Sequence, residues 1–538
     1  MKLHTLHLQR LHRLPLGLPR LLVALLVALM SVAPILSVTH LPANDYPFHL
    51  ARIAILSMGE GSGLLGTYYQ FGSWLLPNMA LDAFALPLTR WLPPEAAVRL
   101  FLVVMQLAFL GGCLALHRAA FGRYSAWPLL GGLLLYNGIF LFGFFNYLFT
   151  AAFALLGAAL WLRMQPGWVR RGVTFCVAVV LMWGHMGGFA VYAILVSAFQ
   201  LQACLAPAAR RNWPAAIGAL LLDFLPFVAS LALFVWLSPG KERAAEGLVY
   251  DAWWAAKPLS ALFALQSGVL WADVLVGLVL AGLALALLLR RQLAVSGAML
   301  AAAGLLWLAF VVLPPEMLGS SFADVRLVPV AALVSLLAVA PRAPKRLTEA
   351  LVLTAALVLG GVKTAALISD WQSHEPQIDN VVQAMKRIPA GSTLFAATAA
   401  PYTSMWLSAP GARETWHPPL KHVASYASVV GSVFVPMTFA DPHKQPMVMA
   451  PAYRAVKNLQ GDNPFKVPQS TDLQALARRL TDEIRVPGGP DLGRVFLLVV
   501  GTDRYTTLPA LTEFTTFVAG AGFVIYQATP LLTPSHGR

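Results

Sequence analysis

Charged side chains are scarce in this sequence, which excludes an ordinary soluble protein. Asp, Glu, Lys and Arg together make up 12% of the 538 residues, whereas soluble domains carry about 25%. Apolar residues make up 58%, and the mean hydropathy is +0.68. Because charge is costly to place in hydrocarbon, this composition is typical of a membrane protein.

Cysteine is scarce too, with Cys113, Cys176 and Cys204 the only three in the chain. Each lies inside an apolar run, and their spacing fits neither a disulfide framework nor a zinc site. We interpret them as small buried hydrophobic residues. The sequence also lacks a Walker loop, an HExxH motif and a GxSxG motif, so no short motif indicates a catalytic class.

The basic residues that are present lie in short clusters between apolar runs, giving a formal net charge of +14. On a soluble protein this charge would suggest nucleic acid as a partner. Clusters of this kind instead indicate how a chain is oriented in a membrane. We therefore expect the lipid bilayer, and no nucleic acid, as a partner.

Residues 1–369 are predicted to be a polytopic α-helical membrane domain, because about 20 apolar residues suffice to cross the hydrocarbon. About eleven spans are expected, near residues 21–39, 97–116, 126–143, 147–162, 172–186, 188–205, 215–237, 269–289, 295–313, 325–340 and 348–369. Segment 74–90 is predicted to be re-entrant or interfacial.

The Lys and Arg residues predict the orientation of these spans. With the N-terminus in the cytoplasm, every second loop is short and basic, whereas the outer loops 40–96 and 238–268 are longer. Residues 1–40 could be a cleaved signal peptide, but the apolar run is long and no A-x-A site follows it, so an uncleaved anchor is expected. An odd number of spans places the C-terminus outside, in the setting of a bacterial inner membrane.

Residues 370–538 are predicted to form a soluble extracytoplasmic α/β domain. The segments GSTLFAATA, RVFLLVVGTDRY and GFVIYQATP are typical of strands bounded by turn residues. Helices are expected near residues 375–388, 471–485 and 508–521.

Polar residues from well-separated segments fall in one layer at the outer membrane surface, which is unexpected unless they have a function. They are Asp45, His49, Arg52, Asn78, Asp82, Asn146, His185, Asp324 and Arg326.

The segment NDYPFHLARI, which follows the first span, carries three of these residues. Asp45 could cap a helix, since Pro47 suits a first turn and a carboxylate there favours the dipole. The spacings of four and seven place His49 and Arg52 on the same helix face as Asp45. The helix is expected to be amphipathic and to lie at the membrane interface. Arg52 could hold a phosphate or pair with Asp45.

The other polar residues of the layer also have two interpretations each. Asn146 lies at a helix turn and could be a cap or a ligand contact. His185 could be a structural residue at a helix end, or it could belong to a site, where Gly187 and Gly188 permit close approach of backbone or ligand. Asp324 and Arg326 could form a local ion pair, or Arg326 could bind a phosphate, since guanidinium matches phosphate oxygens.

Together with the spans, NDYPFHLARI resembles the first outer loop of GT-C glycosyltransferases, multi-span enzymes that take a sugar from a polyprenyl-phosphate donor. The resemblance implies a catalytic acid at Asp45 and often a soluble outer domain. Several GT-C groups carry a second acid, whereas Asn44 stands beside Asp45 here, so a second acid would have to be Asp82 or Asp324. Magnesium or manganese is a possible cofactor, but one carboxylate and one amide make a poor site for either.

The expected function is therefore transfer of a sugar from a polyprenyl-phosphate donor to an acceptor glycan, lipid or protein outside the cytoplasm. Asp45 is the candidate base, and Arg52, Arg326 and His185 are candidates for binding the phosphate. His49, Asp324 and Asn146 are further candidates for binding substrate. The alternatives are a transporter or flippase for lipid-linked glycans and a non-catalytic glycan-binding membrane protein.

Overall fold

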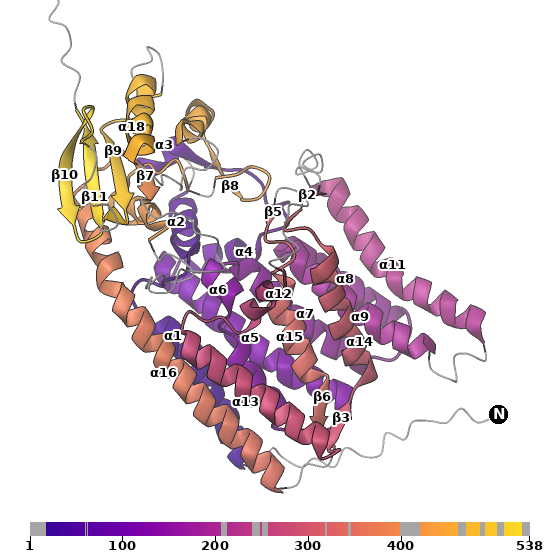
Figure 1. Ribbon diagram of the computed structural model, residues 1–538. Coiled ribbons are helices and arrows are strands. Elements are labelled where there is room, and N and C mark those ends of the chain that lie inside the picture. The colour runs from indigo at the N-terminus through magenta and orange to yellow at the C-terminus, as the bar shows by residue number, and fades with distance from the viewer. Residues whose placement is uncertain are drawn as a thin grey trace, which may run out of the picture.

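The chain is a polytopic α-helical membrane protein with a strand-containing C-terminal domain (Figure 1). The computed structural model describes residues 18–529 apart from 60, 62, 206–211, 239–247, 250–256, 318–319, 343–345, 399–419, 439, 461–469, 485–489 and 503–509.

Most of the helices lie in the first two-thirds of the chain. They are α1 Leu18–Leu36, α2 Tyr46–Ser57, α3 Leu65–Tyr68, α4 Ala80–Leu88, α5 Pro94–Phe121, η1 Trp127–Leu134, α6 Gly138–Phe142, α7 Phe145–Arg163, α8 Trp168–Gly184, α9 Met186–Leu205, α11 Trp213–Leu237, α12 Lys257–Ser260, η4 Ala261–Ala264, α13 Leu270–Leu289, α14 Gly297–Val312, α15 Leu327–Leu337 and α16 Arg346–Met385. Each of the eleven predicted spans contains one or more of these helices.

Seven helices within the described residues are long and apolar enough to cross a membrane, namely α1, α5, α7, α9, α11, α13 and α16. Other predicted spans are shorter than expected. The segment expected at 126–143 is divided into η1 and α6, and that expected at 325–340 is the helix Leu327–Leu337 followed by strand β6 (Val339–Pro341). The count of eleven spans remains a prediction.

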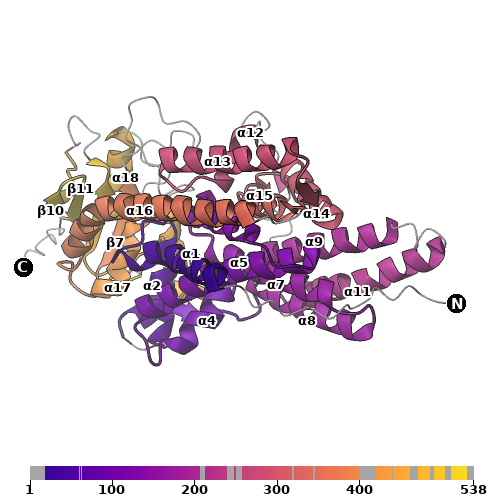
Figure 2. The same cartoon turned by 90° about the horizontal axis from the view of Figure 1, so that it is seen from below.

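The long helix α16 joins the membrane domain to the outer domain without a break. The sequence predicts a span ending near residue 369 and a separate helix near 375–388, but α16 continues through Pro376 to Met385. Figures 1 and 2 show it running along the bundle and ending beside the C-terminal sheet. The boundary predicted at residue 370 therefore falls inside one helix.

The C-terminal domain contains a mixed sheet in the order β10-β11-β9-β7. Strands β7 (Thr393–Thr398), β9 (Val495–Val500) and β11 (Phe523–Ala528) confirm the three predicted strands, and helix α18 (Ser470–Ile484) confirms the helix expected near 471–485.

The helix predicted near residues 508–521 is wrong, because Phe514–Gly520 is strand β10. Residues 508 and 509 lie outside the described residues. The β-branched Thr515, Thr516 and Val518 favour an extended backbone, and β10 pairs with β11 in an antiparallel hairpin.

Smaller elements complete the structure. They are η5 Val423–Ser425, α17 Tyr426–Gly431, η6 Pro451–Gln460, β1 Tyr69–Phe71, β8 Met447–Met449, β2 Leu248–Val249, β4 Glu316–Met317, β5 Ser320–Ser321 and β3 Leu293–Val295. Strand β1 of the first outer loop pairs with β8 of the C-terminal domain, and β3 pairs with β6. The first outer loop and the C-terminal domain are therefore joined by backbone hydrogen bonds.

The helix predicted after the first span forms as α2, but it does not lie on the surface. Every residue from Tyr46 to Ile55 is buried, and α2 packs against α5 and α4 on one side and α17 and η5 on the other. The aromatic ring of Phe48, for example, packs on the ring of His422 at 4.1 Å between centroids. The expected amphipathic surface helix is therefore an internal helix, because the C-terminal domain covers the face that the sequence assigns to lipid.

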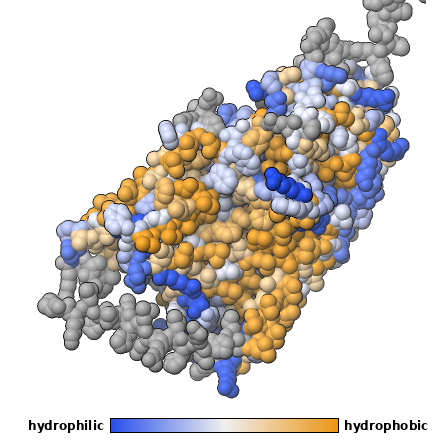
Figure 3. All heavy atoms as spheres, turned by 180° about the vertical axis from the view of Figure 1, so that it is seen from behind, coloured by the Kyte–Doolittle hydropathy of each residue, from blue (hydrophilic) through white to orange (hydrophobic). Residues whose placement is uncertain are grey.

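The molecular surface separates into two regions. Figure 3 shows apolar side chains over the broad middle of the molecule and hydrophilic ones toward both ends, including the end that carries the C-terminal domain. The apolar region includes exposed side chains of α11 and α13, such as Leu221, Val228, Leu278 and Leu289. Both helices are long and apolar enough to cross a membrane.

Candidate active site

Asp45 lies at the junction of the first outer loop, the bundle and the C-terminal domain. It is the N-cap residue of α2, yet within the described part of the chain its side chain makes no capping hydrogen bond. The backbone N–H groups of Asn44 and Asp45 donate to the carbonyl oxygens of Leu141 and Phe142, at 2.9 and 3.2 Å. The chain is thereby fixed against α6, and the carboxylate is left for other contacts.

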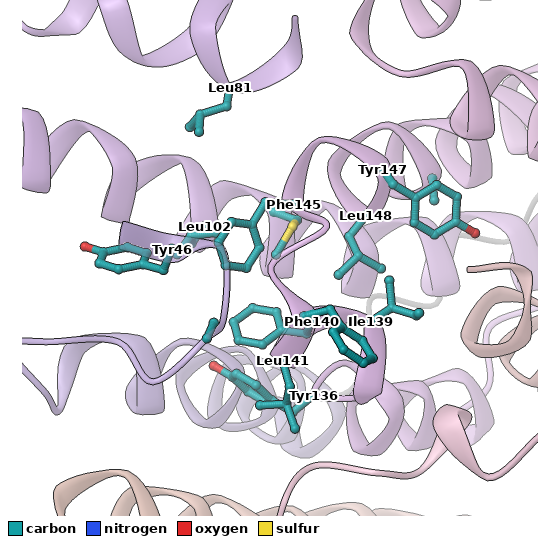
Figure 4. Close-up of a cluster of buried hydrophobic side chains, with 14 of the residues drawn as sticks. Tyr46, Leu81, Leu102, Tyr136, Ile139, Phe140, Leu141, Phe145, Tyr147 and Leu148 are labelled. Carbon is teal, nitrogen blue, oxygen red and sulfur yellow. The ribbon is translucent and has the colours of Figure 1, made fainter. Parts of the chain in front are cut away.

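Gly143, between α6 and α7, is needed for this close approach. Its φ is +86°, and a Cβ added there would lie 2.8 Å from the Cβ of Asp45. Any side chain would therefore push Asp45 away as well as strain the backbone. Figure 4 shows the packed residues around this turn, including Tyr46 from α2, Phe140 from α6 and Phe145 from α7.

The carboxylate of Asp45 is poised between its protonated and ionised forms at neutral pH. Its side chain is 14% exposed, and burial raises its pKa from 3.8 to about 7. The positive charges of Lys421, Arg326 and Arg52 oppose this shift and keep the pKa from rising further. A group with such a pKa can accept a proton near pH 7.

Two residues that the sequence did not single out complete the surroundings of Asp45. Nε2 of His422 lies 3.4 Å from Oδ1 of Asp45. Burial lowers the pKa of the neighbouring Lys421, while the charge of Asp45 raises it. Both residues come from the C-terminal domain, and the surrounding sequence, PPLKHVASY, carries no motif that would have identified them.

Arg326 and His185 lie next to each other on another side of the site. The Arg326 guanidinium stacks over the ring of Phe144 at 4.2 Å, and Nη1 lies 3.4 Å from Nε2 of His185. Phe144 directly follows Gly143, which touches Asp45. The turn between α6 and α7 therefore connects Arg326 to the carboxylate.

The hydrogen bonding of His185 decides what it offers a ligand. Its Nδ1 accepts the N–H of Gly187 at 2.9 Å, and burial and Arg326 lower its pKa to about 3, so the ring is neutral. We infer from this acceptor role that the ring proton lies on Nε2. Nε2–H and an Nη1–H of Arg326 are then both donors, and the two nitrogens lie 3.4 Å apart. They cannot satisfy each other, but one anionic oxygen can accept from both.

The structure gives Arg52 a different partner from those expected. Its Nε and Nη2 donate to the two carboxylate oxygens of Asp82 at 2.7 and 3.0 Å, and both side chains are completely buried. His49 donates from Nε2 to the carbonyl of Gly143 at 2.9 Å, and its Nδ1 faces Arg52. These three residues join α2 to α4 and to the turn at Gly143, so they position Asp45 rather than line open space.

Asn146 and Asn78 also hold structural positions. The Asn146 side chain accepts the N–H of Leu81 at 2.8 Å and donates to both the backbone and side-chain oxygens of Asn78. It thereby ties the first outer loop to α7. Asn146 lies inside α7, whose N-cap is Phe144, so its side chain bonds the start of α4 and does not cap its own helix.

Asp324 does not form the ion pair with Arg326 that the sequence allowed. It is fully buried and lies 3.5 Å from Nζ of Lys257. Lys257 also donates to the carbonyl oxygens of Phe310, Val311 and Leu313. Tyr250, Trp253 and Trp254 are expected from the sequence to form an aromatic belt at the membrane interface, and they lie outside the described residues.

The residues around Asp45 fit a divalent cation poorly. Lys421 and Arg326 already place positive charge beside the carboxylate, and Asp82 and Asp324 are each paired with a cation of their own. Among the described residues, no cluster of three or more His, Cys, Asp or Glu side chains could hold a metal ion. The arrangement instead suits an anion beside a proton acceptor.

Comparisons with known proteins give one pair of matches. No family model and no curated protein matches the sequence. Two solved structures align with it: ArnT from Cupriavidus metallidurans bound to undecaprenyl phosphate, and the same protein in the apo state. Each covers 95% of this chain and 98% of ArnT with a TM-score of 0.49, at 13% and 12% sequence identity. At this similarity we draw no conclusion from the alignment.

Proposed function

We propose that this protein is a membrane glycosyltransferase, which transfers a sugar from a polyprenyl-phosphate donor to an acceptor on the outer side of a bacterial inner membrane. The observation that carries the proposal is the pairing of a carboxylate whose pKa is about 7, Asp45, with cationic and neutral donors around it. Lys421, Arg326 and His185 are these donors. A base and an anion site are the two parts that this reaction requires.

In the proposed step, the acceptor hydroxyl oxygen attacks the anomeric carbon of the donor sugar. The bond between that carbon and the phosphate oxygen breaks, and the phosphate leaves with the electron pair. The hydroxyl proton passes to the Asp45 carboxylate and is later released to water. Arg326, His185 and Lys421 stabilise the charge on the departing polyprenyl phosphate, in a buried site where such contacts are strong.

The depth of the site supports a lipid-linked donor. Arg326 begins α15, and His185 lies between α8 and α9, so both are at ends of helices of the membrane domain. A phosphate on a polyprenyl chain lies at this level, while the chain remains in hydrocarbon. A water-soluble nucleotide sugar would have no need of a site at this depth.

The C-terminal domain contributes residues to the proposed site. Lys421 and His422 reach Asp45 from this domain. A truncated protein that ends after α16 would lack both residues, and we expect it to lack transferase activity.

The flippase alternative has less support. A transporter should have available polar groups at mid-membrane. The buried Lys363 on α16 lies 3.1 Å from Asp273 and donates to the carbonyl oxygens of Leu133, Tyr136 and Leu265. Its three N–H groups are therefore taken up by contacts between helices, which favours a structural role.

A deletion strain tests the proposal. Lipid-linked and envelope glycans are compared by mass spectrometry in the deletion strain and after complementation with wild type, Asp45→Asn or Asp379→Asn. Asp379 is the matched control, because it is a carboxylate on the same side whose side chain is 47% exposed.

We expect one acceptor to accumulate without its sugar in the deletion strain and with Asp45→Asn, and to be modified with wild type and Asp379→Asn. Identical glycan profiles in all four strains, with equal expression of the protein, would refute the proposed function.

A further inference from the structure

An open cavity lies at the opposite end of α2 from Asp45, between α2, α4 and the loop that joins them. Its volume is about 470 Å³, and it is lined by Ile55, Leu56, Ser57, Gly59, Gly66, Tyr69, Gln70, Phe71, Trp74, Leu86, Thr89 and Arg90. Cavities that bind small molecules measure about 300–1,000 Å³ and combine aromatic walls with a few polar groups. This cavity has both properties.

The aromatic part of the lining is held in place by the fold. The rings of Phe71 and Trp74 pack at 4.9 Å between centroids. The carbonyl oxygen of Trp74 accepts a hydrogen bond from Nε1 of Trp183 at 2.7 Å, which anchors the loop to α8. The Trp74 side chain nevertheless remains 44% exposed. A fixed, exposed indole offers an apolar face to a ligand without a large loss of entropy.

The polar part of the lining offers both acceptors and donors. The hydroxyls of Ser57 and Thr89 donate back to the carbonyl oxygens of Ala54 and Leu86, at 2.8 and 2.7 Å, so they present only lone pairs to a ligand. The amide of Gln70 can donate and accept, and Arg90 donates. Among the described lining residues, Arg90 is the only charged one. The cavity therefore favours a neutral or acidic ligand rich in hydroxyls.

We propose that this cavity binds a sugar unit of the acceptor, so that the acceptor is an oligosaccharide or polysaccharide. A sugar combines hydroxyl groups with apolar C–H faces, which matches the mixed lining. The proposal rests on the glycosyltransferase function, because it names the acceptor of that reaction.

The distance to Asp45 determines which sugar unit is bound. Ten residues of α2 separate Asp45 from Ile55, and at about 1.5 Å per residue the cavity lies about 15 Å from the base. The unit in the cavity is therefore not the one that reacts. Binding energy from such a remote unit positions the reacting hydroxyl.

Binding of sugars to the full-length protein tests the cavity directly. Asp45→Asn protein is placed in lipid nanodiscs without sugar-based detergents, which would compete, and saturation-transfer NMR is recorded with maltotriose, chitotriose and trigalacturonic acid. We expect at least one trisaccharide to bind. Trp74→Ala should weaken its binding by about fivefold or more, because a stacking surface is lost.

Trp91→Ala is the matched control, because Trp91 is 76% exposed in the same loop and does not line the cavity. It should bind the trisaccharide as the parent protein does. Gln70→Ala should also weaken binding of the trisaccharide. Because the Gln70 side chain is exposed, this variant should fold, and it keeps the test valid if Trp74→Ala fails to fold. Absence of binding to all three trisaccharides would overturn the proposal. So would binding by the Gln70 and Trp74 variants that equals binding by the parent protein.

Activity separates this proposal from the function on which it rests. With the native acceptor, Trp74→Ala should raise KM for the acceptor while kcat and KM for the donor remain unchanged. Transfer with an unchanged acceptor KM would refute the cavity as the acceptor site and leave the transferase standing. Sugar binding that depends on Trp74, together with an absence of transfer activity in the wild-type protein, would refute the transferase and leave a glycan-binding site.

Discussion

Asp45→Asn should remove catalysis without destabilising the protein, and this combination distinguishes a base from a structural residue. Burial raises the pKa of Asp45 from 3.8 to about 7, so the folded protein holds this proton more tightly than the unfolded chain does. Between these two pH values, the free energy of unfolding of wild type falls as pH rises. Above pH 7 the folded protein bears the full free-energy cost of an ionised Asp45. This cost is about 4 kcal/mol, at about 1.4 kcal/mol per unit of pKa.

Asparagine has nearly the same shape as aspartate and cannot ionise, so it avoids this cost. The advantage of the Asn variant over wild type should therefore grow by about 2–3 kcal/mol between pH 5 and pH 8. In a chain of 538 residues, this corresponds to a relative rise in Tm on the order of 1–3 °C. The Asn variant also loses the 3.4 Å contact between the Asp45 carboxylate and His422. This loss lowers the stability gained by the variant by the same amount at each pH above 7.

Thermal unfolding in detergent, followed at one scan rate at pH 5 and pH 8, measures this difference. Asp379→Asn is the control for transfer activity, which it should retain, because that side chain is 47% exposed and contacts His40 rather than the groups around Asp45. Transfer activity of Asp45→Asn should fall by about 10²–10⁴-fold, the usual contribution of a general base. If Asp45→Asn instead lowers Tm more at pH 8 than at pH 5, the ionised carboxylate stabilises the fold and its assignment as the base is refuted.

Four further predictions concern the groups around Asp45. Wild-type kcat/KM should rise tenfold per pH unit below about 7, since the base must be ionised, and a flat pH profile would contradict this. Arg326→Ala should raise KM for the polyprenyl-phosphate donor and lower kcat by about 10²-fold or more, whereas a change confined to acceptor kinetics would exclude a phosphate role. Arg52→Met should destabilise by about 3–5 kcal/mol by leaving Asp82 buried and unpaired, and Arg52→Met with Asp82→Leu should recover most of this in thermal unfolding. Gly143→Ala should fold but lose activity, because its Cβ would displace Asp45, and full activity in this variant would argue against so tight a site.

The main architecture can be read from the sequence because it depends on local patterns. Apolar runs predict the helices of the membrane domain, and short apolar segments bounded by turn residues predict β7, β9 and β11. The prediction failed at residues 514–520, where FTTFVAG forms a strand. A short apolar segment fits a helix or a strand equally well until its partner, here β11, is known.

The position of Asp45 after the first span could likewise be predicted, since it depends only on where that span ends. The burial of α2 could not be predicted from the sequence. Its spacing of apolar and polar residues is that of a surface helix, but the C-terminal domain covers it. Whether a face meets lipid or protein depends on what packs against it, and that segment lies more than 350 residues further along the chain.

The sequence by itself therefore determined that this is a many-helix membrane protein with a strand-containing C-terminal domain, and it predicted that polar residues gather at one membrane surface. Only the tertiary structure decided which of those residues pair with each other and which surround Asp45. It pairs Arg52 with Asp82, brings Lys421 and His422 to Asp45, and sets Arg326 beside His185. Ion pairs form between side chains that packing brings within a few ångströms. The sequence around a carboxylate therefore does not show which cation will lie beside it.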